Sequence, residues 1–338
     1  MPDMVYEYNP RRAGLISLYV IAERSCTTKM DWLLIILTVA GLSVFEIVSS
    51  IDNAIINADV LATMGEKARR WFLFWGLIFA VFVVRGLLPW LIVWATTPSL
   101  GPIGALLATF SSDPAVVAAI EESAPVLLIF GGMFLVLLFF HWLFVEEKTC
   151  GLRSEAFFSR QSVWFYAVAS ILLAVIVWFA LQIDTLMGFA AVLGSTAFFI
   201  VHGFRQNAEV QEARLRRPGM SDFSKIAYLE VLDATFSIDG VIGAFAFTLS
   251  VPLILIGNGI GAVVVRELTV RGVDKIRSYC FLKNGAMYSI LVLGTIMLAD
   301  SFGFHIPTWL SPIATFGIVG YFLYRSMQEQ KKGAAGTV

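Results

Sequence analysis

Residues 46–53 read Glu-Ile-Val-Ser-Ser-Ile-Asp-Asn, and residues 233–240 read Asp-Ala-Thr-Phe-Ser-Ile-Asp-Gly. In both stretches an acid is followed by Ser-Ile-Asp, whose aspartate lies six residues after the acid, and then by Asn or Gly. Each stretch lies within a long apolar segment. An ionisable side chain near the centre of a membrane-spanning helix costs at least about 2.5 kcal/mol, so such residues usually have a function. The two motifs therefore indicate paired acidic sites inside a membrane protein.

The composition supports a membrane location for the chain. Of its 338 residues, 58% are hydrophobic and 14% are charged, against about a quarter charged in soluble domains. The mean hydropathy is +0.79. The formal net charge of −1 gives no bulk field that would attract nucleic acid. The cysteines Cys26, Cys150 and Cys280 are scattered and form neither a metal-binding nor a redox spacing, so we expect no disulfide framework.

Nine stretches are apolar enough to form membrane helices, each of which needs about 20 residues. We therefore predict an all-α, polytopic transmembrane helical bundle of about nine spans. A tight turn near Gln182–Asp184 joins the fourth and fifth stretches into a hairpin. In segment 97–123, Ser112-Asp113-Pro114 has the pattern of a helix start, so we expect a short external or re-entrant helix there. The nine stretches are 32–57, 71–96, 124–145, 162–182, 184–203, 226–249, 252–270, 279–299 and 309–326.

The positive charges predict the orientation, because Lys and Arg are retained in cytoplasmic loops. Four alternate connections (58–70, 146–161, 204–225 and 271–283) and the C-terminal end carry 18 Lys and Arg residues, whereas the intervening connections carry none. The pattern predicts a multi-pass protein of the inner (plasma) membrane. Its C-terminal tail, residues 329–338, is expected in the cytoplasm.

Residues 1–30 do not fit this pattern. They carry four basic residues on the side that should lack positive charge, and their apolar run 13–22 is too short to span. We expect translation to start at Met30, which makes 1–30 a mis-called extension. The alternative is an interfacial tail.

Further matches extend the duplication beyond the acidic motifs. Arg85 follows Gly76 by nine residues, and Arg266 follows Gly257 by nine. The third helices share Gly-Gly-Met-Phe at 131–134 and Gly-Ala-Met-Tyr at 285–288. Since the orientation places the first and sixth spans in opposite directions, the two three-helix repeats are inverted. Secondary transporters with this architecture bind substrate near the midplane, where the repeats meet.

We therefore predict one transmembrane transporter domain. It covers residues 31–328, with repeat one at 31–145, a linking hairpin at 162–203, repeat two at 226–299 and a last span at 309–326.

The predicted site gathers the ionisable residues of the spans. Glu230 and Asp233 are three residues apart and share a helix face. Asp239 would lie about 120° away around a continuous helix, but a break at Ser237–Gly240 would return it to the same site. The predicted ligands are Glu46, Asp52, Asn53, Glu230, Asp233 and Asp239, with Arg85 and Arg266 as counter-charges.

Charge balance suggests what this site binds. Five carboxylates and two arginines leave a net charge of −3, which a divalent cation together with one proton would neutralise. Crowded, desolvated carboxylates hold protons more readily, so metal and protons would compete. Oxygen ligands without cysteine favour hard cations, so Mg²⁺, Ca²⁺ and Mn²⁺ are all candidates. No tightly bound cofactor is expected.

Simpler interpretations remain open for several residues. Arg266 could extend along its span toward the cytoplasmic surface, and Asp52 could lie at the inner rim. His141 fits a hydrogen-bonded residue of the bundle better than a ligand. Asn258 is equally compatible with helix–helix contact and with ligation.

Segments 45–54 and 228–233 resemble the paired acidic motifs of the TerC family of integral membrane proteins, and more closely a TerC-like branch of unknown function. The resemblance covers residues 31–328 and implies membership of the LysE-like transporter superfamily. Several relatives are implicated in manganese export, and others were named for tellurium resistance. It also implies that the cation binds to Glu46, Asp52, Glu230, Asp233 and Asp239. Segment 97–123 is longer than expected for TerC itself.

The favoured function is export of a divalent cation in exchange for protons. The resemblance favours Mn²⁺ as this cation, with Ca²⁺ or Mg²⁺ as alternatives. The alternatives are transport of another solute, such as an amino acid bound through Arg85, and a non-transporting membrane partner in a stress response. We expect no enzyme, since the sequence lacks a His-Glu-x-x-His zinc motif, a Gly-x-Ser-x-Gly elbow and a P-loop. The acidic pairs at 121–122 and 146–147 are interpreted as solvated rims.

Overall fold

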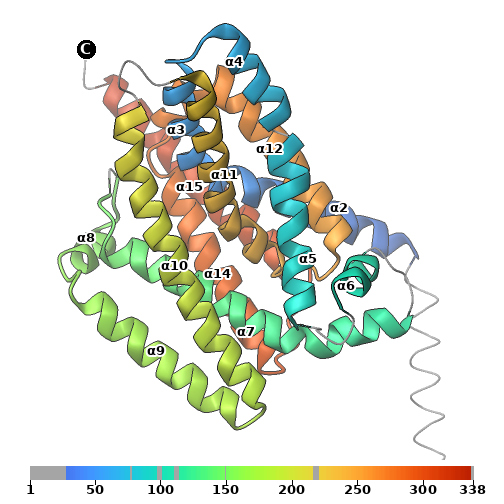
Figure 1. Ribbon diagram of the computed structural model, residues 1–338. Helices are drawn as coiled ribbons and strands as arrows, with labels where there is room; N and C mark the ends of the chain where they lie inside the picture. Colours follow the sequence, from blue (N-terminus) through green and yellow to red (C-terminus); the bar gives the residue numbers. More distant parts are fainter. Residues whose placement is uncertain are drawn as a thin grey trace, which may run out of the picture.

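A computed structural model of the chain describes residues 28–76, 78–96, 101–109, 114–148, 150–215 and 221–335. Helices of different lengths make up most of these residues, and within them there is no strand. The helices form a bundle in which sequence-distant segments lie side by side (Figure 1). The predicted all-α class is confirmed. The prediction about residues 1–30 falls almost entirely outside the described residues.

The first acidic motif lies where two helices meet. Helix α2 (Thr28–Ser49) is followed directly by α3 (Ile51–Leu61). Ser50 has φ −92° and ψ 6°, yet its N–H still bonds the Glu46 carbonyl at 3.1 Å and its carbonyl accepts from Ala54 at 2.9 Å. The departure from helical geometry at Ser50 is therefore local, and the helical hydrogen bonds continue through it.

The second membrane segment contains two widened stretches. It runs through α4 (Glu66–Trp71), η1 (Phe72–Gly76), η2 (Phe79–Val84) and α5 (Arg85–Thr96), where η marks π-helical geometry. Pro89 lies inside α5. Such π segments are rare and frequently lie at functional sites, and here they directly precede Arg85.

Segment 97–123 differs in part from expectation. Helix α6 (Gly101–Thr109) is a short helix in this segment, but it ends before the predicted start at Ser112-Asp113-Pro114. Helix α7 (Pro114–Phe144) begins at the predicted proline, whose missing N–H is not needed in a first turn. However, α7 continues without interruption into the third apolar stretch, so the expected helix start belongs to a membrane helix.

A peripheral hairpin follows the short helix α8 (Arg153–Ser159). Helices α9 (Trp164–Leu181) and α10 (Thr185–Leu215) pack against each other, and α9 lies along the lower edge of the bundle (Figure 1). The turn between them is closed by hydrogen bonds from Ile183 and Asp184 to the Ala180 carbonyl, at 3.0 and 2.9 Å. The predicted tight hairpin is thus confirmed.

The second acidic motif lies on a continuous helix. Helix α11 (Asp222–Ala244) is capped by the Ser221 side chain, which accepts from Ser224 N–H. Residues 237–240 are helical throughout, so the predicted break at Ser237–Gly240 is wrong. Asp239 needs no break because Arg205 of α10 reaches it where it lies.

The remaining helices complete the bundle, and seven helices qualify as membrane spans. The later helices are α12 (Val251–Arg271), α13 (Val273–Ser278), α14 (Leu282–Ser301) and α15 (Leu310–Ala335). Over the described residues, the helices long and apolar enough to span contain 32–49, 66–91, 122–144, 164–181, 185–207, 251–271 and 282–301. Helices α11 and α15 are outside this set, so a total of nine spans stays a prediction.

The centre of the bundle is formed by α7 and α14, which pack closely. A Cβ added at Gly132 would lie 3.0 Å from the Gly294 carbonyl oxygen, and one at Gly294 would lie 3.2 Å from the Gly132 carbonyl. The backbones therefore touch, as small residues allow in membrane bundles.

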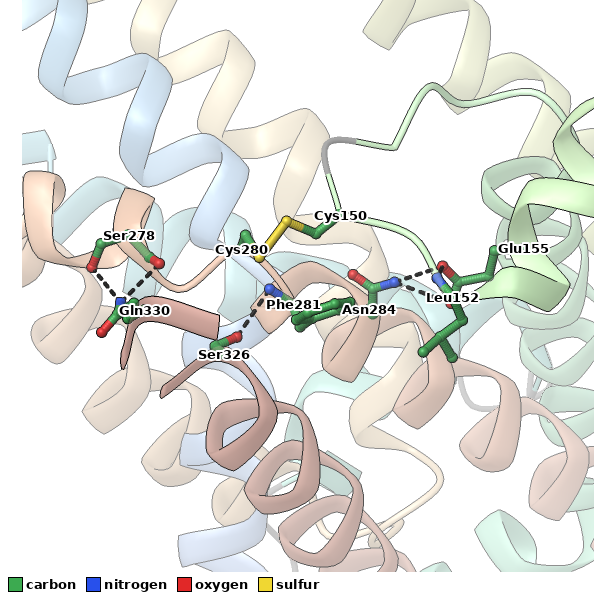
Figure 2. The surroundings of a disulfide bond; sticks show 9 residues. All are labelled: Cys150, Leu152, Glu155, Ser278, Cys280, Phe281, Asn284, Ser326 and Gln330. Carbon is green, nitrogen blue, oxygen red and sulfur yellow. Dashed lines mark hydrogen bonds between the residues drawn. A yellow bond between two sulfur atoms is a disulfide. The ribbon is translucent and has the colours of Figure 1, made fainter. Parts of the chain in front are cut away.

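A disulfide links Cys150 to Cys280, which are 130 residues apart in sequence and have Cα atoms 5.7 Å apart. Figure 2 shows the bond between the chain that follows α7 and the chain that precedes α14. The expectation of no disulfide is wrong. Their spacing carries no signal because the fold, and not the local sequence, brings the two residues together.

The α7–α14 contact predicts the effect of a larger side chain. Gly132→Leu should destabilise the protein by about 1–3 kcal/mol through overpacking, seen as a lower thermal unfolding midpoint in detergent. Gly320→Leu is the matched control, because a Cβ at Gly320 meets no atom within 4 Å. Equal midpoints for both variants would contradict the close contact.

Candidate functional site

The centre of the site is an ion pair between Glu46 of α2 and Arg85 of α5. Arg85 Nη2 lies 2.5 Å from Glu46 Oε1, and its Nε lies 3.2 Å from the same oxygen. The side chains are 0% and 3% exposed. Glu46 Oε1 also accepts from the Ser50 hydroxyl at 2.9 Å. Because a buried charge is stable only with a partner, each of these two residues requires the other.

Asp233 of α11 joins this pair. Its Oδ2 lies 3.7 Å from Arg85 Nη1, and its Oδ1 accepts a 2.5 Å hydrogen bond from Asn53 Nδ2. Three predicted ligands and one predicted counter-charge thus meet, and they come from four helices.

Glu230 and Arg266 lie beside this group. Glu230 contacts the bare backbone of Gly76, and Arg266 Nη2 would lie 3.0 Å from a Cβ there. The Arg266 guanidinium stacks over the Phe72 ring at 4.2 Å. A cavity of about 20 Å³ opens among Arg85, Asp233 and Arg266, with Asn57 also in its wall. Its size suits one water molecule or one ion. We call Glu46, Asn53, Asn57, Arg85, Glu230, Asp233 and Arg266 the deep cluster.

The deep cluster contains buried oxygens that receive no hydrogen bond. Within the described parts of the chain these are Glu46 Oε2, Asn53 Oδ1, Asn57 Oδ1 and both carboxylate oxygens of Glu230. Asn258 of α12 is fully buried with its amide equally unpaired. An unsatisfied buried polar group costs about 1–3 kcal/mol. The cluster therefore offers several oxygen acceptors without protein donors.

Asp52 and Asp239 belong to a second group. Lys283 bonds both Asp52, at 2.8 Å, and Glu146. Arg205 bonds Asp239 at 2.6 Å. A cavity of about 580 Å³, which we call the vestibule, is lined by Asp52, Glu146, His141, His202, Arg205 and Lys283. Asp239 is associated with the vestibule through its ion pair with Arg205. The rings of His141 and His202 have centroids 3.8 Å apart.

The five carboxylates that were predicted to form a single site therefore lie in two groups, the deep cluster and the vestibule. Asp52 and Asn53 are consecutive, yet Asp52 lines the vestibule and Asn53 contacts Asp233 in the deep cluster. Sequence reasoning assigned Arg205 and Lys283 to cytoplasmic loops and Glu146 to a solvated rim. The uncompensated charge of −3 was the signal for more basic partners.

The structure also limits how a metal could bind. Across the described residues, no three His, Cys, Asp or Glu side chains lie as a ready metal-binding group. Arginine and asparagine side chains lie between the carboxylates instead. A metal ion here would have to take most of its ligands from bidentate carboxylates and amide oxygens. A compact group of three carboxylates is not available among the described residues.

Comparison with known proteins gives one family. The family described as Protein of unknown function (DUF475) matches residues 51–333. No curated protein and no solved structure matches the chain. The match covers most of the helices, including the second acidic motif and both arginines, and begins just after Glu46 and Ser50.

The buried ion pair predicts the result of removing Arg85. Arg85→Met leaves Glu46 and Asp233 buried without their cation and should cost about 3–5 kcal/mol, seen as a lower unfolding midpoint in detergent. Adding Glu46→Gln should recover part of the loss. Arg70→Met is the control, because the Arg70–Glu66 pair is 74% and 78% exposed and contributes at most about 1 kcal/mol. Equal midpoints for Arg85→Met and the control would refute a stabilising role.

Proposed function

The chain belongs to the DUF475 family, whose function is unknown, and we propose that it is a membrane transporter that exports a divalent metal cation in exchange for protons. The favoured cation is Mn²⁺. The inner membrane is the proposed location, with the C-terminal tail in the cytoplasm.

The unpaired oxygens of the deep cluster carry this proposal. Glu46, Asn53, Asn57 and Glu230 present five buried oxygens without donors among the described residues. A hard cation is the ligand that such oxygens prefer, since it satisfies several acceptors at once. Arg85 contacts two of the carboxylates, so we infer that the cation competes with Arg85 for them.

The charge balance supports proton exchange. The deep cluster has three carboxylates and two arginines, and the vestibule has Asp52, Glu146 and Asp239 against Lys283 and Arg205. Each group carries a net charge of −1 when fully ionised. The two together carry −2, which one divalent cation or two protons would neutralise. Low-dielectric surroundings disfavour net charge, so one cation exchanged for two protons is the proposed stoichiometry.

The contacts between helices support inverted repeats. Gly76 of the first repeat meets Glu230, and the matching Gly257 of the second repeat accepts from Ser43 at 3.0 Å. Glu230 and Ser43 each lie three residues before an acid of the paired motifs, Asp233 and Glu46. In each repeat, the glycine of the second helix is thus in contact with the first helix of the other repeat.

A second pair of contacts has the same relation. Asn53 bonds Asp233, and Gly240, which matches Asn53, lies against Glu46, with a Cβ there 2.7 Å from Glu46 Oε2. Glycine has no side-chain amide to donate as Asn53 does, which is consistent with the unpaired Glu46 Oε2. We infer that two inverted repeats meet at this site, as in transporters that alternate access around a central site.

The resemblance of the two motifs to the TerC family favours manganese over calcium and magnesium. Tellurite is a poor candidate, because an anion would be repelled by the net negative charge. Arg85 is held by Glu46 and Asp233, which argues against its use as the carboxylate anchor of an amino-acid substrate.

Cellular manganese provides the direct test. Cells expressing the wild-type chain should contain less Mn than vector controls after a Mn²⁺ load, measured by mass spectrometry. Glu230→Gln keeps the shape of the side chain but removes its charge, and should weaken cation binding by about 10- to 100-fold, so that Mn returns to the control level. Glu66→Gln, a change at an exposed acid, should export normally.

The same cells separate the alternatives. Mg and Ca contents would identify a different cation. Asp239→Asn, which leaves Arg205 without its partner, should also reduce export. Equal metal contents in all strains, with membrane expression verified, would reject metal export.

Proton release gives an independent measurement. Titration calorimetry of the purified protein with Mn²⁺, in buffers of different ionisation enthalpy, should report about two protons released per cation near neutral pH. Binding should weaken as pH falls, because protons occupy the same oxygens. Binding without proton release would contradict the exchange mechanism.

A further inference from the structure

The disulfide joins the ends of the two central helices. Cys150 lies six residues after Phe144, the last residue of α7, and Cys280 lies two residues before Leu282, the first residue of α14. In the proposed architecture these helices are the third members of repeats one and two. The bond is therefore a covalent link between two units that must move relative to each other during transport.

Both cysteines are held in place by contacts other than the disulfide. On one side Glu155, which is fully buried, accepts from Leu152 N–H at 2.8 Å and from Asn284 Nδ2 at 2.8 and 3.0 Å. On the other side Phe281 N–H donates to the Ser326 hydroxyl of α15 at 2.9 Å (Figure 2). These contacts would bring the two thiols together again whenever the reduced protein returns to this conformation, so the bond can form again.

The disulfide lies next to the ion pairs of the vestibule. Glu146 precedes Cys150 by four residues, Lys283 follows Cys280 by three, and Lys283 bonds Glu146 and Asp52. Glu146 comes from the α7 side and Lys283 from α14. A bond between Cys150 and Cys280 therefore keeps this ion pair closed.

The predicted location makes the bond unusual. Both cysteines lie in connections whose positive charge predicts the cytoplasm. Disulfides are rare there, and those that form are usually transient and often redox-sensing. Both residues are partly exposed, so a small thiol or disulfide can reach them.

We propose that Cys150 and Cys280 form a reversible thiol switch that stops the transport cycle when oxidised, an inference that rests on the proposed transport function.

The oxidant is a low-molecular-weight disulfide. The thiolate of one cysteine attacks it, expels one small thiolate and forms a mixed disulfide. The second thiolate then attacks the protein sulfur of that mixed disulfide and expels the other. Two cysteines lose two electrons and two protons, and two small thiols are formed. Reduction by excess thiol reverses both steps.

The redox state of the pair is tested first, in a Cys26→Ser background so that only these thiols report. Growing cells are quenched with acid, and free thiols are counted by the gel shift of a polyethylene glycol maleimide. We expect two free thiols in untreated cells and none after a thiol oxidant. A pair that stays oxidised in growing cells and is reduced by a membrane-impermeant reductant added outside would overturn the proposal.

Transport is tested next in inside-out membrane vesicles with an acidic interior, which are given external Mn²⁺ in the presence of oxidised or reduced glutathione. Oxidation should remove most of the proton-driven Mn²⁺ uptake, and reduction should restore it. The double variant Cys150→Ser/Cys280→Ser should transport equally in both conditions. The switch would be overturned if the oxidised wild-type protein, with no free thiols detected, took up Mn²⁺ as fast as the reduced protein.

A third readout does not depend on transport. Lys283 is labelled with an amine reagent, and its labelling is compared by mass spectrometry with that of exposed Lys67. Reduction should raise the labelling of Lys283 and leave Lys67 unchanged, and the double serine variant should not respond. If this response occurs while no vesicle transports metal, the switch stands and the metal-transport proposal fails. If Lys283 labelling is independent of redox state, the switch fails whatever the transport result.

Discussion

The cost of burying charge in a low-dielectric interior governs the arrangement of this bundle. Glu46 and Arg85 are almost fully buried, and neither is stable there alone. Their contact fixes α2 against α5, and the approach of Asp233 to Arg85 adds α11 to the same point. Glycines allow the helices to come this close: Gly261 lies against the Glu46 side chain and Gly240 against its free oxygen. The apolar packing of α7 and α14 then encloses a centre whose geometry is set by charge.

Much of this centre could be predicted from the sequence. Glu46, Asp233 and Arg85 stand out because charges are rare in apolar stretches, and equal spacing identified their counterparts. The partners of Asp52 and Asp239 could not be predicted in the same way. Arg205 and Lys283 lie near span ends, where basic residues normally signal cytoplasmic loops, and α10 in fact continues to Leu215. Their role follows from the packing of α10 and α14 near α3 and α11, which no local pattern contains.

Two other expectations failed for a related reason. The break at 237–240 was needed only if Asp239 had to reach the other acids, and Arg205 removes that need. The cysteines at 150 and 280 have no informative spacing because their contact is made by tertiary structure. Sequence patterns report what a residue requires, such as a partner for a buried charge. Which residue meets the requirement depends on the three-dimensional arrangement.

Because η1 and η2 are π-helical, the equal number of residues between glycine and arginine in the two segments does not give the two arginines equal geometry. Nine residues separate Gly76 from Arg85 and also Gly257 from Arg266. In α12 those nine residues wind as a regular α-helix, whereas the first set passes through wider turns that hold more residues each. Arg85 and Arg266 therefore emerge at different angles around their helix axes. Arg85 contacts two carboxylates, whereas Arg266 lies over the ring of Phe72. In the proposed repeats, the two matching arginines thus make different contacts, and the change of helix type before Arg85 is the structural difference between the two segments.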